Sequence, residues 1–287
     1  MTTDQTTSTK VAYQGERGAF SEAAAKRLLG ATIQSVPCHS FDEMFSAVAT
    51  DAVDAALAPI ENSLAGSIHK NYDLLEEHNF EIIGEINLRI VHNLIAPPKV
   101  TLGEVRRIYS HPVALAQCEK FLRAHPQIEA ISAHDTAGSV RLMMEGGRAD
   151  EAAIAGTMAA QAYGANIIAE GIEDNPQNFT RFLLLTKPER ASDIHPQATS
   201  DTRKTSIIFR VANIPGSLFR AMAAFALRDI DLTKLESRPI EGRPWEYTFY
   251  LDLIGDKTDL NVQRALSHLS EMTESYRVLG SYYRSKD

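Results

Sequence analysis

Helical and extended segments alternate along the chain from about residue 10 to residue 187, and this alternation limits the possible folds most strongly. Segments that follow the strand candidates have helical periodicity and end at glycine or polar turns, as residues 19–29 end at Gly30. The order predicts an α/β fold. The strand candidates are the short hydrophobic runs 10–14, 33–37, 54–60, 107–110, 128–133 and 152–155.

The alternating part is expected to form one domain, residues 9–187, with two lobes. Residues 9–88 build the first lobe and residues 89–179 the second, while the strand at 180–187 returns to the first lobe. Two crossings between lobes create a hinged cleft, and ligands usually bind in such clefts.

Polar residues collect where strands end and helices begin. In open α/β sheets this edge forms the ligand crevice, and helix N-termini there offer free N–H groups and a partial positive charge. Any one Ser, Thr or Asp at such a position is also an ordinary helix cap that needs no ligand. Together they indicate an anion-binding cleft. The set is Ser21, Glu61, Asn62, Ser63, Ser110, His111, Asp135, Thr136 and Thr157.

A further strand is expected at residues 178–186, and its first residues are polar. Strand alternation places Asn178, Thr180 and Phe182 on one face and Phe179 and Arg181 on the other. Taken alone, a strand end with a satisfied threonine and a surface arginine explains this pattern. Together with the other polar strand ends, it indicates groups directed at a polar ligand.

A different unit follows the alternating part. Residues 188–204 are polar and contain proline, which is typical of a linker. The order βαββαβ expected in residues 205–284 predicts a ferredoxin-like unit. This unit carries no obvious nucleophile, base or metal-ligand set.

Composition and motifs exclude several classes of protein. A net charge of −8 argues against a nucleic-acid partner, and no apolar run approaches the ~18 residues of a membrane helix. Cys38 and Cys118 lack metal-site spacing. Gly15 and Gly18 lack the third glycine of a dinucleotide motif. We therefore expect no metal and no cofactor. The polar N-terminus, MTTDQTTSTK, indicates neither signal peptide nor anchor, so a cytoplasmic protein is expected.

Six short motifs in order resemble prephenate dehydratase, from Lys10 to Tyr283. The catalytic part carries GERGAFS (15–21), PIENSLAG (59–66), SHP (110–112) and NFTRF (178–182). NIPGSLF (213–219) and LESRP (235–239) resemble the ACT domain, a small regulatory amino-acid-binding module. The resemblance implies a two-lobed catalytic domain similar to the type II periplasmic-binding-protein fold, plus a ferredoxin-like ACT domain. No chorismate mutase segment precedes Lys10, so we expect a monofunctional enzyme.

The resemblance implies a carbon-oxygen lyase, a hydro-lyase of L-phenylalanine biosynthesis. Its substrate, prephenate, loses carbon dioxide and hydroxide to give phenylpyruvate, and aromatisation makes an electron-sink cofactor unnecessary. Thr180 is implied at the leaving hydroxyl as a hydrogen-bond donor or general acid, tuned by Asn178. Arg181 either pairs with a substrate carboxylate through its planar guanidinium or braces Glu61.

Further residues are implied by the same resemblance. The substrate-binding set is Ser21, Glu61, Asn62, Ser63, Ser110, His111, Thr136, Thr157 and Phe182. His111 fits a helix cap at least as well as a catalytic role. The ACT resemblance implies feedback inhibition by phenylalanine bound between paired ACT domains, and hence a homodimer or homotetramer. The implied effector residues are Asn213, Pro215, Gly216, Ser217, Leu218, Glu236, Ser237, Arg238 and Pro239.

Two other functions stay open. Arogenate dehydratase shares nearly all of these motifs, and residues 134–140 are expected to touch the side chain in which arogenate and prephenate differ. A non-catalytic amino-acid or solute sensor would have the same lobes and anion cleft. A sensor usually has a signal peptide, however, and it leaves NFTRF without a purpose.

Overall fold

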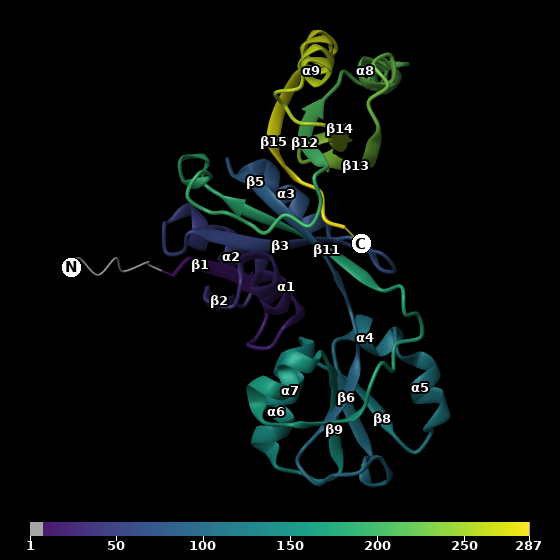
Figure 1. Ribbon diagram of the computed structural model, residues 1–287. Helices are drawn as coiled ribbons and strands as arrows, with labels where there is room; N and C mark the ends of the chain where they lie inside the picture. Colours follow the sequence, from purple (N-terminus) through teal and green to yellow (C-terminus); the bar gives the residue numbers. More distant parts are fainter. Residues whose placement is uncertain (1–7, 287) are drawn as a thin grey trace, which may run out of the picture. The chain divides into compact units, whose positions relative to one another are not determined.

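The computed structural model describes residues 8–286, so most of the polar N-terminal segment discussed above lies outside the described residues. The chain falls into two compact units (Figure 1). Of the described residues, the first unit holds 8–67 and 87–182, and the second holds 68–86 and 183–286. In the described chain, no helix combines the length and the apolar character needed to cross a membrane.

The first sheet has the strand order β2-β1-β3-β11-β5, and β4 pairs with β3. Its strands are β1 (Lys10–Gln14), β2 (Gln34–Cys38), β3 (Ala55–Asn62), β4 (Gly66–Ser67), β5 (Glu81–Arg89) and β11 (Phe179–Thr186). β1 pairs in parallel with β2 and with β3, because α1 (Phe20–Leu29) and α2 (Phe41–Ala49) form the crossover connections. Ser40 caps α2 by accepting from the backbone N–H of Glu43.

The second sheet has the order β10-β6-β9-β7-β8. Its strands are β6 (Asn93–Ala96), β7 (Arg107–Ser110), β8 (Glu129–Ser132), β9 (Glu151–Ala155) and β10 (Asn166–Ala169). Its helices are η1 (Leu102–Glu104), α4 (Pro112–Ala116), α5 (Glu119–Ala124), α6 (Thr136–Gly146) and α7 (Thr157–Tyr163). Tyr13 and Ala19 from the first sheet's side share a core with Ile95, Val140 and Ala159. The two-lobed α/β architecture is therefore confirmed.

Residues 113–124 follow the strand candidate 107–110 and were expected to form one helix from their helical periodicity, but they form two helices. The break falls at Gln117 and Cys118, between α4 and α5. The carbonyl of Gln117 accepts from the N–H of Asp174 at 2.7 Å, and the carboxylate of Asp174 accepts from the N–H of Lys120 at 3.0 Å. Backbone groups that would continue one helix bond instead to a distant segment, so tertiary contacts override the local helical pattern.

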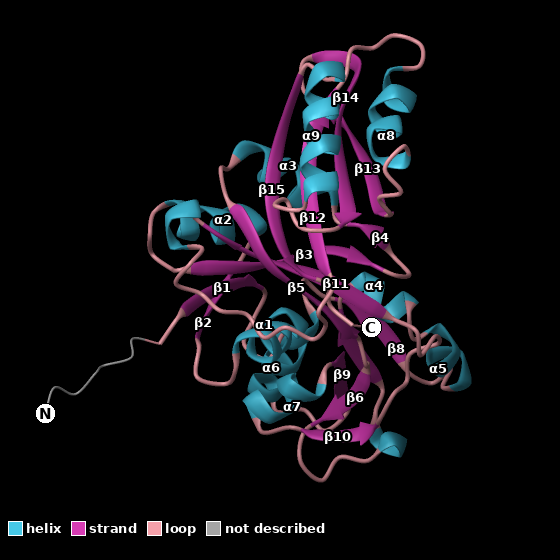
Figure 2. Ribbon diagram, turned by 45° about the horizontal axis from the view of Figure 1, so that its top comes forward, coloured by secondary structure: helices cyan, strands magenta, loops and turns pink. Residues whose placement is uncertain are grey.

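The C-terminal part has the element order βαββαβ and one antiparallel sheet with the order β13-β14-β12-β15. The elements are β12 (Arg203–Arg210), α8 (Ser217–Ala226), β13 (Leu232–Ile240), β14 (Arg243–Ile254), α9 (Leu260–Met272) and β15 (Ser275–Tyr283). Figure 2 shows α8 and α9 side by side on one face of the sheet. Phe209 and Leu251 of the sheet share a core with Phe225 of α8 and Leu266 of α9. The expected ferredoxin-like unit is confirmed.

The opposite face of this C-terminal sheet carries α3 (His69–Glu77) and part of β5. The hydroxyl of Tyr250 donates to the carbonyl of Tyr72 at 2.6 Å. Lys204 Nζ lies 2.8 Å from Glu85 Oε1, and both side chains are buried. Successive residues of each strand point to opposite faces of the sheet, so one set of side chains packs under α8 and α9 while the alternate set faces α3 and β5. One short helix, η2 (Pro188–Arg190), lies in the segment before β12.

Gly280 of β15 packs directly against the backbone of β5. A Cβ at this position would lie 2.0 Å from the carbonyl oxygen of Ile82, a contact that backbone movement alone can relieve. Gly280→Ala should therefore lower the free energy of unfolding by about 3 kcal/mol, the upper end of the range for overpacking. Gly103→Ala is the control, because a Cβ there meets no atom within 4 Å. Equal urea midpoints for both variants would contradict this packing.

Candidate active site

The side chain of Asn62, at the end of β3, joins two of the three residues expected to be catalytic. Its Nδ2 donates to Asn178 Oδ1 at 2.8 Å and to Thr180 Oγ1 at 2.9 Å. Its Oδ1 accepts from the N–H groups of Leu64 at 3.0 Å and Ala65 at 2.8 Å. Because two backbone donors fix the oxygen, the amide must present its N–H groups to β11.

Thr180 is buried at the start of β11, with 8% of its surface exposed. Its oxygen accepts from Asn62, and no acceptor for its own proton is found among residues 8–286. A hydroxyl has one donor and two lone pairs. The Thr180 proton is therefore available to a ligand, while the bond from Asn62 polarises the hydroxyl toward donation.

Asn178 is oriented from its other side by Gln117, a residue that no motif or strand-end pattern in the sequence marks. Asn178 Nδ2 donates to Gln117 Oε1 at 2.9 Å, and His92 Nε2 lies 2.9 Å from the same oxygen. With Gln117 Oε1 as the acceptor, His92 carries its proton on Nε2. Hydrogen bonds thus connect His92 through Gln117, Asn178 and Asn62 to Thr180.

His92 lies in the segment between β5 and β6 and is 2% exposed. Its ring packs edge-to-face on Phe20, with centroids 5.6 Å apart. Burial lowers the pKa of His92 below its usual value, and the bond to Gln117 and the charge of Glu173 oppose this only in part. The imidazole is therefore neutral at pH 7, with its proton on Nε2.

Other expected residues also reach this region. Ser63 follows Asn62 and anchors the start of β11, because its Oγ donates to the carbonyl of Gln177 at 3.0 Å and accepts from the N–H of Phe179 at 2.9 Å. Glu61 and Arg181, both half-buried, lie on the neighbouring strands β3 and β11.

Three residues of the expected substrate-binding set make contacts or are buried within the protein itself. Ser110 is fully buried, and its hydroxyl donates to the carbonyl of Ile154 at 2.6 Å. Phe182 is 2% exposed and lies in the interior. His111 caps α4, because its Nδ1 accepts from the N–H of Val113 at 3.2 Å. Burial lowers the pKa of His111.

The remaining expected residues lie at helix starts. Thr157 opens α7 and accepts from Asn93 Nδ2 at 3.2 Å. Thr136 opens α6 behind the cap Asp135, and Ser21 is buried in the first turn of α1. Gly18 lies against α7, since a Cβ there would be 2.6 Å from Cα of Ala159.

A cavity of about 350 Å³ opens between the two lobes of the first unit. It lies at the carboxyl ends of β1 and β8, the edge where α/β folds bind ligands. Arg141 Nη2 lies 3.3 Å from Glu16 Oε1 and so links the lobes beside it. The residues that line this cavity are Gln14, Gly15, Glu16, His39, Ala133, His134, Asp135, Gly138, Ser139, Arg141 and Leu142.

The expected effector residues lie around two segments of the C-terminal unit. Asn213, Pro215 and Gly216 are exposed, Ser217 is buried, and Leu218 is half-buried at the start of α8. On β13, Glu236 and Arg238 are half-buried, while Ser237 and Pro239 are exposed.

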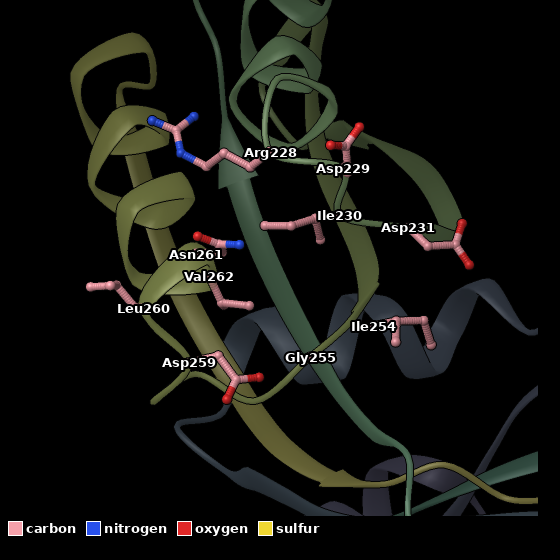
Figure 3. Close-up of a pocket in the computed structure, with 10 residues that line it drawn as sticks. All are labelled: Arg228, Asp229, Ile230, Asp231, Ile254, Gly255, Asp259, Leu260, Asn261 and Val262. Atoms are coloured by element: carbon pink, nitrogen blue, oxygen red, sulfur yellow. The ribbon is translucent and has the colours of Figure 1, made fainter.

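A second cavity of about 480 Å³ lies between the end of α8 and the start of α9 (Figure 3). No residue expected to bind a ligand lines it. Its Arg228 donates to the carbonyl of Ala224 at 2.7 Å, and Asp259 accepts from the N–H of Asp256 at 2.8 Å. Within residues 8–286, no cluster of three or more His, Cys, Asp or Glu could hold a metal ion.

The burial of His92 predicts a pH dependence of stability. Its pKa is lower in the folded state than the roughly 6.5 of an unfolded chain. The unfolded state therefore binds more protons below about pH 6.5, and stability is lost as pH falls through that range. His92→Gln should lose less stability than the wild type between about pH 7.5 and 5.5. If urea titrations showed that the free energy of unfolding falls equally for His92→Gln and wild type between these pH values, the assignment of a lowered pKa to His92 would be contradicted.

Comparison with known proteins agrees with the two-part architecture. The family described as prephenate dehydratase matches residues 11–190, and the ACT domain family matches residues 205–270. Arogenate dehydratase/prephenate dehydratase 2, chloroplastic, from Arabidopsis thaliana is 46% identical over 283 residues, which cover 95% of this chain and 72% of that protein.

Two solved structures share the whole fold. Prephenate dehydratase from Arthrobacter aurescens, in complex with L-Phe, matches with a TM-score of 0.85 and 33% identity over 96% of this chain and 90% of that one. GqqA, described as a novel type of quorum quenching acylase, matches with a TM-score of 0.85 and 32% identity over 96% of this chain and 98% of that one.

The expectation of a cytoplasmic protein is wrong, because curated relatives of this chain are chloroplastic enzymes. That expectation used the absence of an apolar core in the first residues. Transit peptides are Arg- and Ser-rich and amphipathic, so the absence of an apolar core does not argue against one.

The two family matches cover both parts of the fold, and the relatives extend over nearly the whole chain. The chain therefore belongs to the prephenate dehydratase family, as a dehydratase of aromatic amino acid biosynthesis with a C-terminal ACT domain.

Proposed function

We propose that this protein converts prephenate to phenylpyruvate, carbon dioxide and water in L-phenylalanine biosynthesis. The observation that carries the proposal is the Asn62–Thr180 hydrogen bond, which leaves the Thr180 proton free for a substrate oxygen. Family membership supports the reaction class.

The proposed reaction needs no base in the protein. As the ring carboxylate leaves as carbon dioxide, its C–C bonding electrons move into the ring and the C–O bond to the ring hydroxyl breaks. The departing oxygen takes up negative charge and must be stabilised. Thr180 donates a hydrogen bond to it, and Asn62, itself bonded to Asn178, holds Thr180 in place. A proton taken up from the solvent converts the departing hydroxide to water.

We assign the remaining contacts to substrate binding. To Arg181 we assign the pairing with a substrate carboxylate, because its planar guanidinium suits bidentate pairing. The hinged region of residues 9–187 forms the catalytic domain, residues 188–204 the linker and residues 205–284 the regulatory domain. The inter-lobe cavity, which includes His134 and Asp135, receives the pyruvyl side chain.

We infer that phenylalanine inhibits the enzyme by binding between paired ACT domains in a homodimer or homotetramer. The L-Phe complex of the Arthrobacter aurescens relative supports phenylalanine as the ligand. The exposed residues Asn213, Pro215 and Gly216 are accessible to such a ligand. Equilibrium dialysis that detects no phenylalanine binding would contradict this part of the proposal.

Arogenate is the second candidate substrate, because the Arabidopsis thaliana relative is named for both activities. Parallel assays with prephenate and arogenate, following phenylpyruvate and phenylalanine, test both. Turnover of either supports the dehydratase, and the ratio of kcat/KM values assigns the substrate. A folded protein that turns over neither would contradict the proposal.

The hydroxyl of Thr180 should be required for turnover. We expect Thr180→Ala to lower kcat by about 10²-fold or more, the usual scale for losing a proton-donating group. Thr180→Ser keeps the hydroxyl and should retain much more activity than Thr180→Ala. Near-normal kcat in Thr180→Ala, with an unchanged circular dichroism spectrum, would remove Thr180 from the mechanism.

A further inference from the structure

One face of β13 is directed at α3. Along β13 the residues alternate without interruption between half-buried and exposed. Strand periodicity therefore places Lys234, Glu236 and Arg238 on one face. The contacts of Glu236 and Arg238 show that α3 covers this face. Both residues belong to the LESRP motif, so α3 touches the effector segment of the proposed function.

The strongest of these contacts is a two-pronged ion pair. Arg238 donates from Nε to Asp73 Oδ1 at 2.8 Å and from Nη2 to Asp73 Oδ2 at 2.9 Å. These bonds raise the pKa of Arg238. Nearby, His69 Nε2 lies 3.4 Å from Glu236 Oε1. A bidentate pair fixes orientation as well as distance, so a shift of Arg238 is passed to Asp73.

Other bonds fasten α3 to the same sheet. Thr248 donates to Glu76 Oε1 at 3.0 Å, and Arg210 pairs with Glu76 as well. Arg277 donates to the carbonyls of Leu75 at 2.6 Å and His78 at 3.0 Å. These bonds come from β12, β14 and β15, whereas the pairs His69–Glu236 and Asp73–Arg238 join α3 to β13 itself.

The N-terminal end of α3 is joined to the loop that orients Asn62. β4 ends at Ser67 and α3 begins at His69, so one residue, Ile68, separates them. β4 pairs with the end of β3, Gly66 opposite Asn62 and Ser67 opposite Glu61. The same short loop supplies the two N–H groups that fix the Asn62 amide.

We propose that α3 transmits the state of the effector strand β13 to Asn62, and that Asp73 is the positioning residue that couples them. When phenylalanine moves the LESRP segment, the Arg238–Asp73 pair displaces α3. The helix then pulls on β4 and changes the orientation of the Asn62 amide toward Thr180. This inference rests on the proposed function, whose substrate site and effector site it connects.

Asp73→Asn tests the coupling, because asparagine keeps the shape of the side chain and removes its charge. We expect near-wild-type kcat without effector and retained phenylalanine binding in equilibrium dialysis. The factor by which saturating phenylalanine lowers kcat/KM should shrink by about 5-fold or more, within the usual range of allosteric coupling. Glu81→Gln is the matched control. It removes the ion pair of Glu81 with Lys257 (3.1 Å), which also joins β5 to the C-terminal part but does not involve β13.

Hydrogen exchange supplies a readout that a purely structural role would not move. Phenylalanine should change amide exchange of residues 62–67 in the wild type and in Glu81→Gln, and not in Asp73→Asn. Full inhibition of Asp73→Asn with wild-type phenylalanine binding overturns the inference and leaves the dehydratase intact. Absence of turnover with either substrate would contradict the proposed function. In that case the coupling would still be supported if phenylalanine changed exchange of residues 62–67 in the wild type but not in Asp73→Asn.

Discussion

The amide of Asn62 is the contact on which the organisation of the site depends. It bonds to two residues at the start of β11, and its own oxygen is held by the loop that follows β3. A β3–β11 pairing alone would bring Thr180 into the region without fixing the direction of its hydroxyl. The doubly held amide fixes that direction, so the Thr180 proton is presented to a ligand before any ligand binds.

The chain of amides extends this preorganisation away from the reacting group. Gln117 accepts from both Asn178 and His92, so the orientation of Asn178 depends on a buried neutral imidazole. Preorganised dipoles of this kind require no reorganisation during reaction.

The local sequence pattern predicted most of the helices and strands. The features that it did not predict are set by contacts between residues distant in sequence. The strands Lys10–Gln14 and Arg107–Ser110 were predicted with their observed ends, because the hydrophobic pattern and the turn signals lie within and beside each segment. The break at Gln117 has its cause in Asp174, and no local signal marks it. Asn178 and Thr180 could be chosen as candidates from strand alternation and resemblance. Gln117 and His92 could not, since their importance lies in bonds to partners distant in sequence. The attachment of α3 to the C-terminal sheet was hidden for the same reason.

A crystal structure of the protein with an unreactive substrate analogue would locate the ring hydroxyl relative to Thr180. We expect this oxygen to lie about 2.7–3.0 Å from Thr180 Oγ1, with Asn62 still donating to Thr180. A ring hydroxyl bound elsewhere in the cleft, or an Asn62 amide turned away from Thr180 in the complex, would contradict this expectation.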